Sequence, residues 1–430
     1  MKKSLFAVAA LSALAGAAQA QSSVTVYGIL DVGINSGNAR LAPGSSTAVS
    51  RATGVAISGG AESTNRLGFK GTEDLGGGLS AFFTIEQAIT PNGDSAFANS
   101  GNMNRQVFAG LKKKGLGDFA IGTQYTPIHN ALSKTDAGQA NNILGDVIYV
   151  SSSMPSATSI PAATGTANYD NLDTNVGYTV RTKNTLQVNS DTFAGFQAHA
   201  MVVASNNNSN VTAYTPATGS TGNVTGGVNN NNGWGLGLDY TWNKLFATAN
   251  YQSLTSKNPY DLTTTYSLNA SSGATKSAAG TVGSPSIWGL GGSNAFGSNV
   301  QDNQTYLGAT YDFGILKAYA QWVNRKVSSQ LDSNMYLKRQ AQQIGVRSFI
   351  TPTVEAWASA GNGKVTAYGL SNPSANFTGF QLGSNYWLSK RTNLYAIYGQ
   401  SQTSNVAASA TTGFMSSNAN NYAIGVRHTF

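Results

Sequence analysis

Charged side chains are scarce in this chain, at 10% of its residues, and many stand singly among alternating apolar ones. In Asn65–Thr72, Leu67 and Phe69 fall on one face of an extended segment, and Arg66 and Lys70 fall on the other. Side chains placed in this way act through their charge. A narrow, water-poor passage lined by one sign of charge concentrates ions of the opposite sign.

Covalent and metal chemistry find little support in the sequence. The three histidines, His129, His199 and His428, are far apart, the chain has no cysteine, and no HxxxH or HExxH spacing occurs. A membrane-barrel lipase would need a serine, a histidine and a polar orienting group together, and the surroundings of His199 do not supply that pattern. We therefore expect no enzyme, no metal site and no cofactor.

The elements that carry the charges are predicted to be strands. Alternation of apolar and polar residues recurs in sixteen segments, from the first at Val24–Ile34 to the last, which ends at Phe430. Short turns rich in Gly, Asn, Asp or Lys alternate with long polar connections. Soluble sandwiches do not show this regular alternation of connection lengths, whereas a transmembrane barrel has short turns at one end and long loops at the other.

The composition agrees with an all-β membrane protein. Mean hydropathy is only −0.18, and beyond the N-terminus no segment reaches the roughly 20 consecutive apolar residues of a membrane helix. Backbone groups in lipid must all be paired, which a closed barrel achieves. We predict a 16-stranded antiparallel β-barrel over residues 21–430. Aromatic residues near predicted strand ends, such as Trp242 and Tyr311, are expected to form girdles at the membrane surfaces.

The first 20 residues have the features of a secretory signal peptide. Met1-Lys2-Lys3 precedes an alanine-rich apolar segment that ends in Ala18-Gln19-Ala20. A membrane anchor is the alternative, but the apolar part is short. Export without cysteine means that strand pairing and burial, and no disulfide, must stabilise the fold.

The closing segment alternates as a strand that ends on an aromatic residue. Tyr422, Ile424, Val426 and Phe430 are expected on the lipid-facing side, with Arg427 on the opposite side. This apolar set resembles the signal that outer-membrane assembly machinery recognises, so removal of Phe430 should impair assembly before it alters permeation.

If the apolar faces contact lipid, the interior receives mostly basic residues. Seven bases and two acids fall on this face, and Asp31 and Asp239 moderate the excess; the nine are Arg66, Lys70, Glu86, Arg181, Lys183, Lys317, Arg347, Glu355 and Arg427. Weak to moderate anion preference is expected. The pI of 9.4 does not indicate nucleic-acid binding, because the bases are spread among the strands.

Several motifs resemble the general diffusion porins of beta-proteobacteria. They are Ser22–Gly28, Arg66–Gly78, Gly122–Pro127 and the Val426–Phe430 end. The resemblance implies a homotrimer in outer-membrane lipid and lipopolysaccharide, assembled by machinery that recognises the C-terminal strand. It also implies that the third external loop, about Tyr125 to Tyr178, folds into the lumen as a constriction through which small hydrophilic solutes diffuse passively.

The resemblance adds some site candidates and casts doubt on the charge pattern. Thr123 and Gln187 stand where such porins commonly carry basic residues, so the basic ladder is thinner here. Arg105 is suggested by the family, but alternation places it with the apolar Val107. An arginine at mid-membrane depth costs about 2–4 kcal/mol, so Arg105 must lie above the membrane or turn inward at a bulge.

The constriction loop is expected to supply negative charge opposite the arginines. Its candidates are Asp136, Asp146, Asp170 and Asp173, and turn formation is an equally weighted alternative for each. Two other functions stay open. One is a channel specific for a dicarboxylate, phosphate or sugar, and the other is an adhesin or phage receptor that acts through loops such as Ser205–Asn232.

Overall fold

A computed structural model of the chain describes residues 23–42, 50–91, 93, 104–149, 177–215, 223–258, 264–269, 273–278, 298–330, 336–368, 374–403 and 416–430. The proposed signal peptide lies outside these residues. Within the described part of the chain, no helix is long and apolar enough to cross a membrane.

One antiparallel sheet contains seventeen strands and closes on itself. The strands of the first half are β1 (Ser23–Ala42), β2 (Ser50–Gly59), β3 (Arg66–Gly76), β4 (Leu79–Ala88), β5 (Asn104–Lys113), β6 (Gly117–Tyr125), β7 (Arg181–Ser190), β8 (Phe196–Thr215), β9 (Asn223–Trp242) and β10 (Leu245–Asn258). Those of the second half are β13 (Ser298–Asp312), β14 (Lys317–Ser329), β15 (Tyr336–Phe349), β16 (Val354–Tyr368), β17 (Ser374–Trp387), β18 (Thr392–Thr403) and β19 (Ser416–Thr429).

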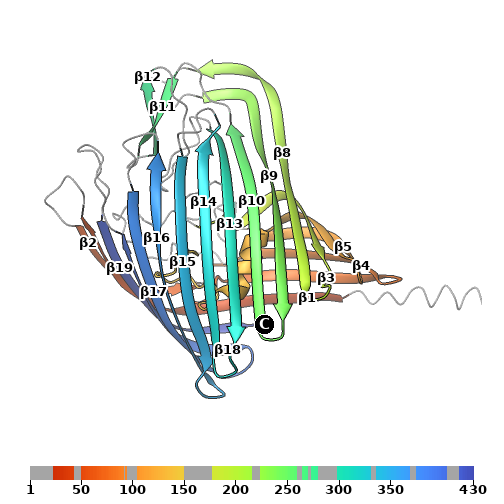
Figure 1. Cartoon of the computed structure of the whole chain (residues 1–430), viewed down its shortest axis with the longest axis vertical. Coiled ribbons are helices and arrows are strands. Elements are labelled where there is room, and N and C mark those ends of the chain that lie inside the picture. The colour runs from red at the N-terminus through yellow and green to blue at the C-terminus, as the bar shows by residue number, and fades with distance from the viewer. Residues whose placement is uncertain are drawn as a thin grey trace, which may run out of the picture.

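Pairing of β1 with β19 closes the barrel. The two strands run antiparallel from Ile29 opposite Thr429 to Ala42 opposite Ser416. On its other side β1 pairs with β3 over its first part and with β2 over its last part, so β2 and β3 together occupy one strand position. The wall therefore has sixteen positions, as predicted. In Figure 1 the strands β13–β17 cross the N-terminal strands at a steep angle, as the tilted opposite walls of a barrel do.

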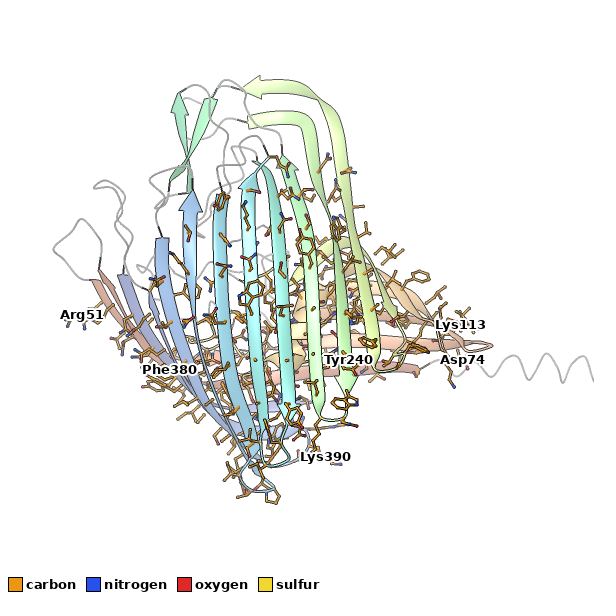
Figure 2. All side chains as sticks on the ribbon, in the orientation of Figure 1. Arg51, Asp74, Lys113, Tyr240, Phe380 and Lys390 are labelled. Carbon is orange, nitrogen blue, oxygen red and sulfur yellow. The ribbon has the colours of Figure 1, made fainter. Side chains whose placement is uncertain are left out.

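Short and long connections alternate as the sequence predicts. Turns such as Gly77–Gly78, 114–116 and 243–244 join hairpins at one end, and Gly77 and Gly78 have φ of 60° and 76°, which glycine adopts without strain. Figure 2 shows Asp74, Lys113 and Lys390 at the tips of short-turn hairpins. Four elements were not predicted. They are β2, the two strands of a separate hairpin, β11 (Thr264–Asn269) and β12 (Gly273–Ala278), and the helix α2 (Pro127–Thr135).

The wall has an apolar face and a polar face. Large apolar side chains at alternate positions are exposed, for example Leu236, Ile344 and Leu382 at 56%, 68% and 52%. Their neighbours on the other face, such as Gln343 and Gln381, are buried. Because a protein in water would bury the first set, this inverted pattern is the one that lipid solvation produces.

The C-terminal strand follows the same pattern. Tyr422, Ile424, Val426 and Phe430 are all exposed on the apolar face. The backbone of Phe430 exchanges two hydrogen bonds with Gly28, at 3.1 and 3.2 Å, so the final residue helps to fasten the closing strand to β1.

We expect deletion of Phe430 to reduce assembly. It removes the backbone pair with Gly28 and an aromatic side chain from the lipid-facing girdle. The yield of heat-modifiable barrel in outer membranes should fall, while the channels that do assemble keep their conductance. Phe193→Ala, which removes an 83%-exposed ring from a short turn, is the matched control. Full yield after loss of Phe430 would contradict this role.

Candidate functional site

The long connection between β6 and β7 begins with the helix α2 (Pro127–Thr135). Thr126 caps it by accepting a hydrogen bond from the backbone N–H of His129, and Pro127 occupies the first turn, where no N–H is needed. Ile128, Ala131 and Leu132 are buried against Tyr306 and Val323 of the wall. The described parts of this connection, residues 126–149 and 177–180, are called the inner segment below.

Two carboxyl groups of the inner segment are fastened by one glutamine on the polar face of β15. The Gln343 amide donates to Asp146 Oδ2 at 3.1 Å and to Asp136 Oδ1 at 3.3 Å, and it accepts from the Val147 N–H at 3.0 Å. Asp136 also accepts from the Ala140 N–H, and Asp146 from the N–H groups of Ile148 and Tyr149. Both carboxyls are buried, and burial raises their pKa values, that of Asp146 to about 8.

These contacts bear on the acidic residues expected opposite the arginines. Asp136 and Asp146 are 1% and 4% exposed, and their bonds are those of turn formers. Their geometry therefore matches the alternative considered for them. Asp170 and Asp173 lie outside the described residues.

Glycines on the polar face let the inner segment approach the wall closely. A Cβ on Gly399 of β18 would overlap the carbonyl oxygen of Leu144 and lie 3.1 Å from Ile143. On β17, a Cβ on Gly379 would lie 3.0 Å from the Gly145 carbonyl carbon. Gln381, which pairs with Gly399 in the register of β17 and β18, donates to the carbonyls of Ile143 and Leu144 at 2.7 and 3.0 Å.

On the N-terminal strands β3, β4 and β5, two arginines lie close to one glutamate. Arg105 Nε lies 2.7 Å from Glu86 Oε1, and Arg66 Nη1 lies 3.9 Å from the same oxygen. A shift in register between β4 and β5 at Glu86 makes Arg105 the extra residue of a bulge. Its guanidinium is buried and also donates to the Tyr125 hydroxyl. Of the two positions that the sequence allowed for Arg105, the structure has the inward turn at a bulge.

A third arginine, Arg181, and a histidine, His129, lie beside these residues. The Arg181 guanidinium lies 5.4 Å from the centre of the Tyr125 ring, and the centre of this ring lies 4.3 Å from that of the His129 ring, with the two planes tilted by 34°. Burial, and next the positive charges of Arg181, Arg105 and Arg66, hold the pKa of His129 well below its usual range. The imidazole is therefore neutral, and its Nδ1 lies 2.8 Å from the Tyr178 hydroxyl. We call Arg66, Arg105, Arg181 and Glu86 the arginine cluster; three positive charges and one negative charge give +2.

The other predicted basic residues are dispersed. Lys70 is exposed, with its ammonium 5.3 Å from the Tyr27 ring centre, and Lys183 is exposed beside a bulge where Asn184 has φ of 50°. Arg347 is buried and ion-paired with Glu355. Arg427 is half-buried, and its Nη1 lies 3.4 Å from Asn393 Oδ1. None of these four belongs to the arginine cluster.

Comparison with known proteins decides the family. A sequence model of a protein family, described as Gram-negative porin, matches residues 7–406. The chain belongs to this family. It is accordingly a transmembrane barrel of the Gram-negative outer membrane.

Individual relatives match over shorter segments of this porin. Outer membrane porin protein 32 of Delftia acidovorans is 41% identical over 143 residues, which cover 33% of this chain and 37% of that protein. An outer membrane porin protein of Bordetella pertussis is 32% identical over 155 residues, or 34% and 40% of the two chains. The matches thus span less than half of these relatives' own length.

Solved porin structures share the fold along nearly the whole chain. The anion-selective porin from Comamonas acidovorans superposes with a TM-score of 0.61 at 21% identity, over 95% of this chain and all of that one. OmpT of Vibrio cholerae in its trimer form gives 0.55 at 14% identity, over 95% and 99%. At these identities the likeness establishes the fold alone.

The structure adds charged groups to the polar face that sequence reasoning missed. Arg325 and Asp302 form a buried ion pair at 2.6 Å, and buried Arg339 donates to the Val147 carbonyl at 2.8 Å. The expected strands stopped short of these residues. If the alternation is continued past Val323 and back from Ala341, it places both arginines on the polar face.

In the described part of the chain, no three His, Asp or Glu side chains gather as metal ligands would.

Proposed function

We propose that this porin forms a water-filled channel for passive diffusion of small hydrophilic solutes and ions, with a weak to moderate preference for anions. The inner segment folds into the lumen and narrows it against the N-terminal strands. The observation that carries the proposal is the charge arrangement of the polar face. The arginine cluster has a charge of +2, and it stands across from a wall on which Arg325 and Arg347 are each paired with a carboxylate.

On the opposite wall, formed by β13 to β16, two arginines make short ion pairs with carboxylates. Arg347 and Glu355 share two hydrogen bonds, one of them 2.8 Å long, and Arg325 pairs with Asp302 at 2.6 Å. An ion pair of this kind has a weak field beyond its own length, whereas the net charge of the arginine cluster acts on ions that pass it. The similar porin from Comamonas acidovorans is described as anion-selective, which agrees with this sign.

Packing supports the position of the inner segment. Its contacts, from Thr135 to Leu144, are with polar-face residues of β13 to β18, and Asn142 reaches the break between β2 and β3, where its amide donates to the Gly60 carbonyl at 2.6 Å. A segment tied to strands on both sides of the β1–β19 closure crosses the barrel interior. The remaining free space then lies beside the N-terminal strands.

Several further properties belong to this proposal. The barrel is a homotrimer embedded in lipid and lipopolysaccharide, is exported by a signal peptide at residues 1–20, and is inserted by machinery that reads the C-terminal strand. It has no catalytic activity and no cofactor. The trimer form of the similar OmpT structure supports the oligomeric state.

Liposome swelling tests the proposed channel. Vesicles that contain the purified barrel should swell in isotonic solutions of small sugars, at rates that fall steeply as solute size increases. Heat-denatured protein in the same vesicles is the control. Swelling no faster than in protein-free vesicles would overturn the proposal.

A further inference from the structure

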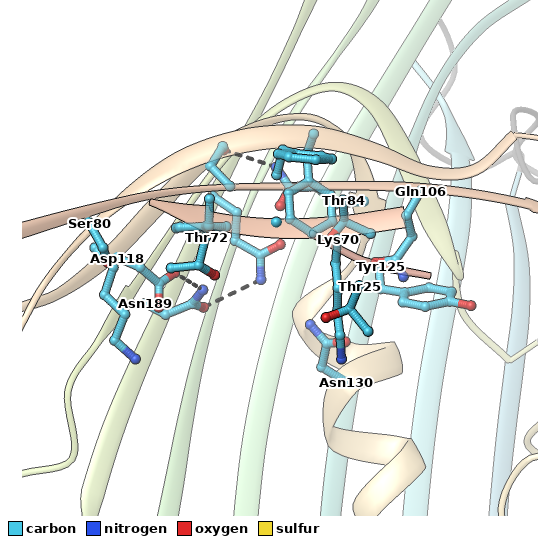
Figure 3. A pocket seen from close by; sticks show the side chains of 18 of the residues that line it. Thr25, Lys70, Thr72, Ser80, Thr84, Gln106, Asp118, Tyr125, Asn130 and Asn189 are labelled. Atoms are coloured by element: carbon cyan, nitrogen blue, oxygen red, sulfur yellow. Dashed lines mark hydrogen bonds between the residues drawn. The ribbon is translucent and has the colours of Figure 1, made fainter. Parts of the chain in front are cut away.

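A cavity of about 520 Å³ lies at the short-turn end of the barrel, between the N-terminal strands and helix α2. Its lining includes polar-face residues of β3 to β7 and Asn130 of the helix. Figure 3 shows Lys70 reaching from the strands towards Asn130. The cavity adjoins the arginine cluster, since Tyr125 lines the cavity and accepts a hydrogen bond from Arg105.

Two phenylalanines stand in these polar surroundings. Phe82 of β4 and Phe108 of β5 are on the polar face, where a water-filled barrel usually carries polar side chains. Their rings meet edge to face with centres 6.3 Å apart, and both remain only half-buried. Aromatic surface that is left facing an aqueous cavity is available to an aromatic solute.

Local packing explains part of the arrangement. A Cβ on Gly110 would lie 2.8 Å from the Phe82 ring, so this ring covers a glycine of the neighbouring strand. Covering Gly110 uses one side of one ring. It does not account for Phe108 or for the exposed surface of both rings.

Cationic and amide groups surround the aromatic pair. Lys70 and Lys112 line the cavity with Asp118, whose carboxylate accepts a hydrogen bond from Asn189 at 2.8 Å. These three charged groups sum to +1. Gln106, Gln187 and Asn130 add amides that can donate to a carboxylate.

We propose that this cavity is a binding subsite for small aromatic carboxylates. The solute's ring lies against Phe82 and Phe108, and its carboxylate faces Lys70 and Lys112. The inference rests on the proposed channel function and adds to it a preferred class of solute. It requires a ring and a negative charge in the same molecule.

Block of ion current tests the subsite. Benzoate, acetate and benzyl alcohol are added to the short-turn side of single channels in a planar bilayer. Benzoate should reduce the current at a concentration about fivefold lower than acetate, the ratio that about 1 kcal/mol of ring contact produces. Benzyl alcohol, with a ring and no charge, should have little effect.

Variants separate the contributions. Phe82→Leu with Phe108→Leu should abolish the difference between benzoate and acetate while KCl conductance is retained, and Lys70→Gln should weaken block by both anions. Phe119→Leu, whose ring is 40% exposed on the apolar face of β6 and does not line the cavity, is the matched control. Equal block by benzoate and acetate in the native channel, or benzoate block that survives the double replacement, would overturn the subsite. Absence of any KCl conductance would instead contradict the proposed channel.

Discussion

Gln343→Leu is expected to release the inner segment and widen the channel. The replacement removes three hydrogen bonds, to Asp136, Asp146 and the Val147 N–H, without a large change in volume. The two carboxyls keep their backbone donors, but the Val147 N–H loses its bond to Gln343, and a buried group left without a partner costs about 1–3 kcal/mol. Since about 1.4 kcal/mol is a factor of ten, the population with a displaced segment should rise by one or more orders of magnitude.

Conductance and solute size limit are the measurements for this variant. Single-channel conductance in KCl should increase, and larger sugars should enter liposomes that exclude them with the native protein. Gln342→Leu is the matched control, because Gln342 is the next residue of β15 and is exposed on the opposite face. Native conductance and size limit in Gln343→Leu would show that the inner segment does not restrict the passage.

Replacing Arg66 and Arg181 together by glutamine should remove the anion preference. The arginine cluster would fall from +2 to zero, while Arg105 stays paired with Glu86 at 2.7 Å, so no buried carboxylate loses its closest partner. In water, a charge about 8 Å from an ion contributes roughly 0.5 kcal/mol. Anions lose this attraction and cations lose the matching repulsion, while salt screens both effects. The chloride-to-potassium permeability ratio should therefore fall several-fold, to near one.

The loss of anion preference should depend on where the positive charges are removed as well as on how many are removed. Lys390→Gln with Arg391→Gln removes two positive charges from a short turn between β17 and β18, where both residues are exposed. This variant should keep the native permeability ratio. An equal loss of preference in both double variants would mean that overall charge, and no local cluster, governs selectivity.

The strands were predictable because lipid and water impose a period of two on each of them. Segments such as Leu79–Gln87 alternate apolar and polar residues, and Ile85 of this segment is exposed on the apolar face as predicted. In β2 only Val55 and Ile57 supply a large apolar side chain among Gly, Ala and Ser, so the pattern is weak. That strand is defined by its pairing with β1, which is tertiary information.

The site was predictable only in part, because it depends on contacts between distant residues. Arg66 and Arg181 were placed on the polar face by alternation, but the inward turn of Arg105 depends on a bulge opposite Glu86. The inner segment has no strand period to follow. Its bonds to Gln343 join Asp136 and Asp146 to a residue 207 and 197 positions away, a contact that no local pattern of the sequence indicates.

The reversal potential of the native channel in a KCl gradient tests the central claim most directly. With the arginine cluster at +2 beside the free passage, the account predicts a potential whose sign shows that chloride permeates faster than potassium. A potential of the opposite sign, with potassium preferred, would contradict it.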